Sequence, residues 1–137
     1  QKYSGMENII KKDLYRYTGF KGGKGFLKGF KLPGFRYMYF FRLASTSKKY
    51  SIVRMFSEFL LRRYSYKFGF QIPSSTKIGE GFYIGHHGNI IINARTIIGK
   101  NCNIAPLVTI GRANRGKRKG VPKIGDKVWI YPNMSVL

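Results

Sequence analysis

The sequence predicts a mostly β fold in which short strands wind into a solenoid, preceded by an N-terminal α-helical region. The first observation is an aliphatic residue at every sixth position in the second half of the chain. The second is a three- and four-residue spacing of apolar side chains in the first half. A period of six fits neither an amphipathic strand, with its period of two, nor a helix, with its period of 3.6. It is typical of a repeat that stacks short strands and turns.

The six-residue repeat predicts which side chains point inward. Its aliphatic positions are Ile72, Ile78, Ile84, Ile92, Ile98, Ile104, Ile110, Ile124, Ile130 and Val136. Glycine follows several of these residues and allows a tight turn without a Cβ clash. These glycines are Gly79, Gly85, Gly99, Gly111 and Gly125. Stacking of successive coils would bury each inward isoleucine, which contributes ~1.5 to 3 kcal/mol per side chain.

The register of the repeat breaks twice. Two extra residues lie between Ile84 and Ile92, and eight lie between Ile110 and Ile124. Because a coil of fixed size has no room for additional residues, we expect both insertions to leave the wall as loops. The second insertion contains the basic segment 112–121, RANRGKRKGV, which we expect to be an extruded loop.

The first half of the chain is expected to be helical mainly over residues 35–68, and these helices could cap the solenoid. The stretch 19–34 is too interrupted by glycine for a helix, and we expect a loop or linker there. We place a boundary near Gln71. Residues 1–71 then form the helical region with its Gly/Lys-rich linker, and residues 72–137 form the solenoid.

Composition narrows the class of protein. The chain has 26 Lys and Arg residues against 5 Asp and Glu residues, which gives a formal net charge of +21. Such a field attracts phosphates, anionic lipid head groups or acidic glycans without choosing among them. The single cysteine, Cys102, excludes an internal disulfide framework. No apolar stretch approaches the ~20 residues that span a bilayer, and the N-terminus lacks a signal-peptide pattern, so we expect a cytoplasmic protein.

The segment from Ile72 to Ile130, which includes IGHHGNIIIN, VTIG and GVPKIGDKVWI, resembles the serine acetyltransferase branch of the hexapeptide-repeat acyltransferases. The upstream stretches DLYRYTG, PGFRY and LRRYSYKFGFQIP are similar to bacterial members associated with surface-polysaccharide biosynthesis. This resemblance implies a left-handed parallel β-helix, acetyl-CoA as the acyl donor, no metal, and a homotrimer. Because the sequence ends inside the third coil, we also expect a β-helix that is incomplete at its C-terminus.

The resemblance also assigns roles to individual residues. The general base of the family is the histidine of an I-G-H-x-G-x-I-x-I-N segment, and the matching residue is His86. A positioned imidazole can take the proton of a hydroxyl as that hydroxyl attacks a thioester. His87 and Asn89, close to this histidine, are candidate contacts to the acceptor.

The donor, CoA, requires backbone groups beside its pantetheine arm and cations near its phosphates. Thr109 and Gly111 match positions that border the thioester arm in relatives, and Arg112 and Lys123 are candidate phosphate contacts. Further candidates in the basic loop are Arg115, Lys117, Arg118 and Lys119.

Three positions depart from the serine acetyltransferase pattern. Gly85 replaces an aspartate, Val121 replaces a histidine, and Tyr131 replaces a glycine. The serine-binding set is therefore incomplete, and we expect the acceptor to be a hydroxyl of a sugar or polysaccharide precursor. The alternative is serine O-acetylation for cysteine biosynthesis.

Two other classes of function follow from charge and aromatic content. Nucleic-acid binding would rely on basic and aromatic stretches such as FRYMYFFR, but the charge alone is non-specific. We expect no nucleic-acid partner. The basic, aromatic first half could instead attach the protein peripherally to the anionic inner face of a membrane.

Overall fold

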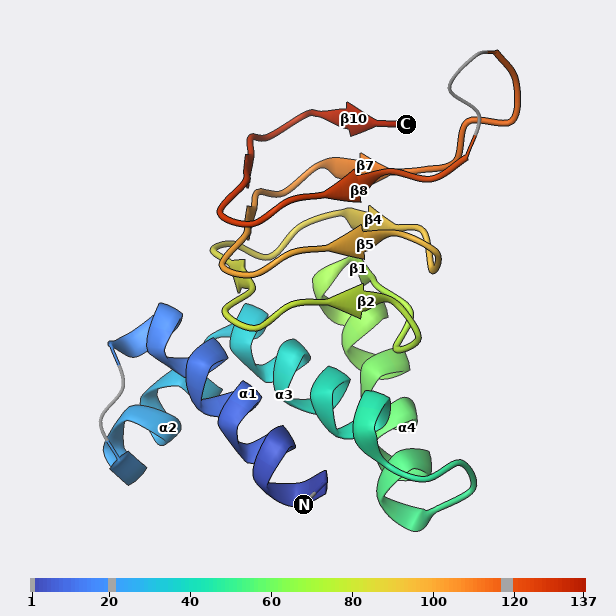
Figure 1. Cartoon of the computed structure of the whole chain (residues 1–137). Helices are drawn as coiled ribbons and strands as arrows, with labels where there is room; N and C mark the ends of the chain where they lie inside the picture. The colour runs from blue at the N-terminus through green and yellow to red at the C-terminus, as the bar shows by residue number, and fades with distance from the viewer. Residues whose placement is uncertain (1, 20–21, 117–119) are drawn as a thin grey trace.

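The computed structural model describes residues 2–19, 22–116 and 120–137. In these residues the helices precede the strands along the chain. The helices are α1 (Lys2–Thr18), α2 (Gly22–Phe30), α3 (Pro33–Thr46) and α4 (Ile52–Phe68). Figure 1 shows the helices gathered at one end of a stack of β-coils, which rises away from them toward the C-terminus.

The strands wind into a coil with three faces. They are β1 (Phe70–Gln71), β2 (Lys77–Ile78), β3 (Tyr83–Ile84), β4 (Ile90–Ile92), β5 (Ile97–Ile98), β6 (Asn103–Ile104), β7 (Val108–Ile110), β8 (Lys123–Ile124), β9 (Trp129–Ile130) and β10 (Ser135–Val136). Successive strands join different parallel sheets, whose orders are β1-β4-β7-β10, β2-β5-β8 and β3-β6-β9. The chain therefore adds one strand to each face per turn, which is the architecture of a three-sided parallel β-helix.

The six-residue repeat supplies the core of this coil, so the predicted inward positions are confirmed. The aligned residues are Ile78, Ile98 and Ile124 on one face, Ile84, Ile104 and Ile130 on the second, and Ile92, Ile110 and Val136 on the third. Ile124 and Val136 are partly buried against the core, and the others are buried. We call each stack of aligned inward residues a rung. Every turn of the coil adds one residue to each rung and so removes further apolar surface from water.

The helices hold more residues than the strands, so the prediction of a mostly β chain understates the helical part. The loop or linker expected at residues 19–34 is wrong, because α2 occupies most of that stretch. The rings of Phe26 and Phe30 pack on Tyr39 at centroid distances of 5.5 and 5.7 Å, and this packing offsets the low helix propensity of glycine. Gly29 allows α2 to approach α1, since a Cβ there would lie 2.5 Å from Cδ1 of Leu14.

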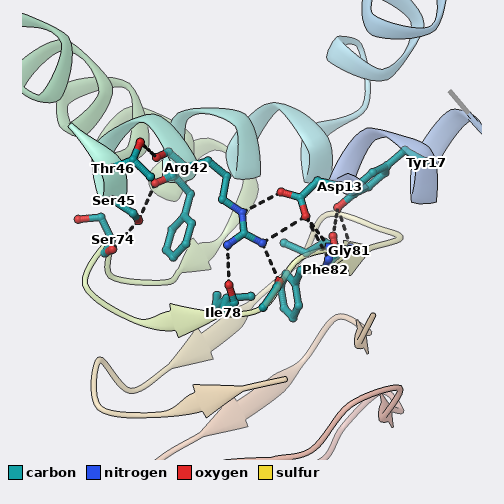
Figure 2. Close-up of polar contacts among 12 residues, drawn as sticks. Asp13, Tyr17, Arg42, Ser45, Thr46, Ser74, Ile78, Gly81 and Phe82 are labelled. Carbon is teal, nitrogen blue, oxygen red and sulfur yellow. Dashed lines mark hydrogen bonds and ion pairs between the residues drawn. The ribbon is translucent and has the colours of Figure 1, made fainter. Parts of the chain in front are cut away.

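The helices cap the first coil through side-chain hydrogen bonds, which Figure 2 shows. The lower edge of this coil has backbone groups with no further coil beneath them to pair with. Arg42 of α3 donates to the carbonyl oxygens of Ile78 and Gly79 at 2.6 and 2.8 Å. The carboxylate of Asp13 in α1 accepts from the N–H group of Gly81 at 2.9 Å. Because unpaired buried backbone groups are costly, these contacts seal this end of the solenoid.

Two tyrosines and a glycine extend the cap. The hydroxyl of Tyr37 donates to the carbonyl oxygen of Ile72 at 3.0 Å. The hydroxyl of Tyr17 accepts from the N–H group of Ile84 at 2.8 Å. At Gly34, a Cβ would lie 2.2 Å from the carbonyl oxygen of Ile84, so glycine lets α3 lie directly on the edge of the coil.

Both insertions fall in connections between strands. Residues 85–89 connect β3 to β4, and residues 111–122 connect β7 to β8. The second connection leads away from the wall in its described residues 111–116 and 120–122 (Figure 1), and Ala113 and Gly120 form an antiparallel bridge. The strands on either side of each connection still pair in register with their neighbours in the sheets.

The helical region joins the coil directly. The helix α4 ends at Phe68, and Gly69, with a φ of 80°, turns the chain into β1 at Phe70. Buried residues of α3, α4 and the coils belong to one apolar cluster. The helices and the solenoid therefore share a core.

Candidate active site

His86 lies in the first insertion, at the corner where the chain passes from β3 to β4. Its side chain is exposed. The backbone just after it is held in place, because the N–H group of Gly88 donates to the carbonyl oxygen of Phe68 at 3.0 Å and the N–H group of Leu107 donates to the carbonyl oxygen of Asn89 at 2.7 Å. These bonds place the imidazole on a short loop anchored to a rigid scaffold.

His86 lines a groove of about 220 Å³ on the outer surface of the coil. The other lining residues are Tyr83, Gly85, Asn103, Ile104, Ala105, Trp129, Ile130 and Tyr131. Most of them belong to β3, β6 and β9, so the groove lies along one face. Trp129 and Tyr131 are 61% and 64% exposed. Exposed aromatic rings beside a histidine are typical of a ligand-binding surface.

The helix α1 supports this groove from one side. The rings of Tyr17 and Tyr83 lie 4.9 Å apart between centroids, and the guanidinium of Arg16 lies 5.8 Å from the centroid of Tyr83. Arg16 also donates a hydrogen bond to Oδ1 of Asn103. Two groove-lining side chains, on β3 and β6, are thus held by a helix from the start of the chain.

Gly85 is packed closely against the groove wall. A Cβ at this position would lie 3.0 Å from Cε1 of Tyr83, which is tighter than an ordinary contact. An aspartate, which the serine acetyltransferase pattern requires here, would therefore push on the tyrosine ring. Because Tyr17 and Arg16 contact the same ring, it has little freedom to give way.

The candidate donor contacts lie on other parts of the coil. Thr109 is the middle residue of β7, between two buried residues, and is half-buried. Gly111 and Arg112 follow the same strand, and Lys123 begins β8. None of these four residues lines the groove that contains His86. Within one chain, the predicted donor contacts are therefore not part of the groove that contains the predicted base.

The remaining basic-loop candidates are described only in part. Arg115 is exposed. Lys117, Arg118 and Lys119 lie outside the described residues.

The candidate acceptor contacts His87 and Asn89 flank Gly88 and are exposed, but neither lines the groove. The side chain of Asn89 lies against the end of α4, since a Cβ at Gly69 would lie 2.7 Å from Oδ1 of Asn89. Their contact with an acceptor stays a prediction.

Sequence reasoning missed most of the groove. Tyr83, Asn103 and Trp129 each directly precede an inward isoleucine of one rung. Aligning the coils in register would therefore have identified them as neighbours on one outer face. Arg16 carries no such signal, because it reaches the groove from a helix 87 residues away from Asn103 in sequence.

Two further properties bear on the class of site. None of the helices within the described ranges combines the length and apolarity needed to cross a lipid bilayer. Among the same residues, no three His, Cys, Asp or Glu side chains are grouped so that they could hold a metal ion.

Comparison with known proteins identifies serine acetyltransferases as relatives. The chain is 32% identical over 108 residues to the serine acetyltransferase of Helicobacter pylori, and the match covers 77% of this chain and 61% of that protein. It superposes with a TM-score of 0.75 and 26% identity on serine acetyltransferase isoform 3 of Entamoeba histolytica, solved in complex with cysteine, over 98% of this chain and 49% of that chain. The Neisseria gonorrhoeae serine acetyltransferase, solved in complex with serine, shares the fold with a TM-score of 0.72 and 24% identity, over 96% of this chain and 55% of that chain. No model of a known protein family matches the chain.

The chain thus spans less than two thirds of the length of these relatives. Because superposition preserves the hand of a coil, the match over 98% of the chain indicates the left-handed winding of the serine acetyltransferase β-helix domains. The sequence similarity to serine acetyltransferases, together with the architecture of helices and coils shared with them, supports assignment of this chain to the hexapeptide-repeat acyltransferase family.

Proposed function

We propose that this protein is an O-acetyltransferase that moves an acetyl group from acetyl-CoA to a hydroxyl, with His86 as the general base. The observation that carries the proposal is the exposed imidazole of His86, placed in a groove by an anchored loop of a coil related to serine acetyltransferases. Because the chain spans 61% of the Helicobacter pylori relative, the activity of the whole protein is part of the proposal.

The reaction needs one proton acceptor and no acyl-enzyme. The acceptor oxygen attacks the carbonyl carbon of the thioester while its proton passes to a ring nitrogen of His86. A C–O bond forms, and negative charge moves to the carbonyl oxygen of a tetrahedral intermediate. Collapse of this intermediate breaks the C–S bond, and the departing sulfur takes the proton from the imidazolium. The products are an acetyl ester and free CoA.

We propose that the active form is a homotrimer. The donor candidates Thr109, Gly111, Arg112 and Lys123 lie away from the groove of His86 in one chain. A neighbouring copy packed beside this groove could supply them, so that CoA lies between two subunits. The resemblance to the family supports this arrangement, and the separation of the two sets of residues gives it a physical reason.

Serine is the first acceptor to consider. The relatives found by sequence are serine acetyltransferases, and the Entamoeba histolytica structure holds cysteine, an amino acid of similar size. These similarities support serine O-acetylation over the sugar acceptor that the surface-polysaccharide resemblance predicts.

A sugar hydroxyl is the second candidate, and the groove itself favours it. Gly85 stands where the serine pattern has an aspartate, and Tyr83 leaves little room for one. Val121 stands where that pattern has a histidine. The exposed rings of Trp129 and Tyr131 instead offer flat apolar surfaces of the kind that pack against a sugar ring.

The proposal is tested by following release of free CoA from acetyl-CoA with serine, amino sugars and nucleotide-linked sugars in turn. For the acceptor that is used, His86→Ala should reduce kcat by roughly 10²- to 10⁴-fold, the usual contribution of a general base. The thermal midpoint of the variant should match that of the parent, since the imidazole is exposed. Equal rates for the two proteins would remove His86 from the mechanism.

A further inference from the structure

A second hollow lies next to the groove of His86. Its volume is about 600 Å³, and we name it the basic hollow. It is lined by Lys12, Tyr15, Arg16, Glu80, Asn101, Lys127 and Trp129. We propose that the basic hollow is an acceptor subsite, which binds the phosphate of a phosphate-bearing sugar while a hydroxyl of that sugar reaches His86. This inference rests on the O-acetyltransferase function proposed above and specifies its substrate class.

The two hollows form one continuous surface. Trp129 lines both of them. Arg16 lines the basic hollow, and its guanidinium contacts Tyr83 and Asn103, which line the groove of His86. A ligand that rests on Trp129 can therefore contact His86 on one side and the basic hollow on the other.

The charges of the basic hollow favour an anion. Three cations line it against one carboxylate. That carboxylate, on Glu80, is shared between two lysines, with Oε2 3.0 Å from Nζ of Lys12 and Oε1 3.8 Å from Nζ of Lys100. Lys127 forms no ion pair with any carboxylate in the described part of the chain. A bound phosphate would accept charge-assisted hydrogen bonds from this lysine and from Arg16, and such bonds are stronger than those between neutral groups.

The aromatic side chain between the two hollows suits a sugar ring. Trp129 is 61% exposed although it belongs to a strand of a regular coil. An exposed indole combines a large apolar face with a polar N–H group, and a pyranose ring has the same mixed character. Tyr15, which also lines the basic hollow, adds a second exposed ring.

The length of the combined surface separates this acceptor from serine. Glu80 precedes β3 and His86 follows it, so the two hollows lie toward opposite ends of this strand and meet at Trp129. Free serine is small enough to lie in the groove of His86 alone, whereas a phosphate-bearing sugar has a ring to rest on Trp129 and a phosphate to reach the cations of the basic hollow.

Binding is tested by isothermal titration calorimetry of the full chain without acetyl-CoA, which makes the readout independent of activity. The probes are glucosamine, glucosamine 1-phosphate, UDP-linked glucosamine and inorganic phosphate. We expect both phosphate-bearing sugars to bind more tightly than glucosamine. Lys127→Gln should weaken their binding about tenfold, the effect of losing one charge-assisted hydrogen bond. Lys77→Gln, which removes the same charge from an exposed position on β2, is the matched control and should not weaken it.

Trp129→Ala separates the sugar from its phosphate. It should weaken binding of the phosphate-bearing sugars and leave inorganic phosphate unaffected. A preference for the UDP-linked sugar over the 1-phosphate would identify a nucleotide-linked acceptor, and the reverse would identify a simple sugar phosphate. Failure of both phosphate-bearing sugars to bind, or equal weakening by Lys127→Gln and Lys77→Gln, would overturn the subsite.

The thioester assay distinguishes this inference from the proposed function. Release of CoA with serine, together with no binding of phosphate-bearing sugars, would keep acetyl transfer and remove the subsite. Lysine-dependent binding of the sugars without release of CoA for any acceptor would keep the subsite and remove acetyl transfer.

Discussion

The carboxylate of Asp13 and the guanidinium of Arg42 form a buried ion pair, with Oδ2 of Asp13 2.8 Å from Nε of Arg42. The two residues come from α1 and α3, and each also bonds to the backbone of the first coil, through Gly81 and Gly79. The pair thus joins two helices and the solenoid at one point (Figure 2). The two side chains neutralise each other and also pair with backbone groups at the edge of the coil. Removal of one partner would leave the other charge buried and unpaired.

Arg42→Met should therefore destabilise the protein by about 3 to 5 kcal/mol in urea unfolding at neutral pH. Burial raises the pKa of Asp13 above its ordinary value, and the adjacent Arg42 acts in the opposite direction. Without the arginine the pKa of Asp13 rises further. A carboxyl whose pKa is higher in the folded state than in the unfolded chain stabilises the folded state at low pH, and this contribution is lost as the pH rises through the folded pKa. The difference in stability between Arg42→Met and the parent should therefore be smaller in acid than at neutral pH. Lys12→Met, which removes an exposed partner of Glu80, is the control and should cost no more than about 1 kcal/mol.

Tyr37 should make the protein sensitive to alkali. Burial raises the pKa of Tyr37 to about 12 from 10.0, the negative charge of Glu58 adds to this rise, and the hydrogen bond with the backbone of Ile72 acts in the opposite direction. The folded state thus holds this proton more tightly than the unfolded chain. The resulting stability is present in full below pH 10 and is lost as the pH rises toward 12.

Comparison with Tyr37→Phe isolates this effect. The lysines titrate in the same pH range, but they do so in both proteins, so their contribution cancels in the difference. At about pH 8 the variant should be less stable by about 1 to 3 kcal/mol, since the buried backbone of Ile72 loses its partner. The difference should shrink by about 1.4 kcal/mol by about pH 11. A difference in urea midpoints that stays constant with pH would contradict the role of this hydroxyl.

The rungs of the coil can be tested with two neighbouring isoleucines. Ile98 is 2% exposed and points into the coil, whereas Ile97 is 40% exposed and points outward from the same strand. Ile98→Ala should cost about 2 to 5 kcal/mol of unfolding free energy, because it leaves a cavity between two other rung residues. Ile97→Ala should cost well under half of that. Equal losses in urea unfolding would mean that the inward stack does not hold the coil together.

The inward isoleucines could be predicted because they recur at every sixth position of the sequence. The two insertions could be predicted because they interrupt that spacing. The helix α2 could not, because four of its nine residues are glycine and its stability comes from the packing of Phe26 and Phe30 on a later helix. His86 was predictable from a local motif. Its surroundings were not, because Arg16 reaches Asn103 through contacts that only the folded chain creates.

The exposed face of α4 gives the predicted contact with anionic membranes a location. Ile52 and Phe59 are 85% and 61% exposed, although both are large apolar residues. Exposed cations lie on the same helix and in the turn before it, at Lys48, Lys49, Arg62, Arg63 and Lys67. The single acidic residue of α4, Glu58, is occupied by a hydrogen bond from Ser74. With a net charge of +21, the chain is attracted to an anionic bilayer.

Co-sedimentation with vesicles tests this location directly. We expect the protein to bind vesicles of phosphatidylserine and phosphatidylcholine, and to bind vesicles of phosphatidylcholine alone much more weakly. The double variant Ile52→Ser and Phe59→Ser should reduce binding to the anionic vesicles by about tenfold or more, because two apolar side chains no longer enter the interface. Leu107→Ser, at a position 54% exposed on the coil, is the matched control and should bind as the parent does. Binding that is equal for both vesicle types, or unchanged in the double variant, would show that α4 does not contact the membrane.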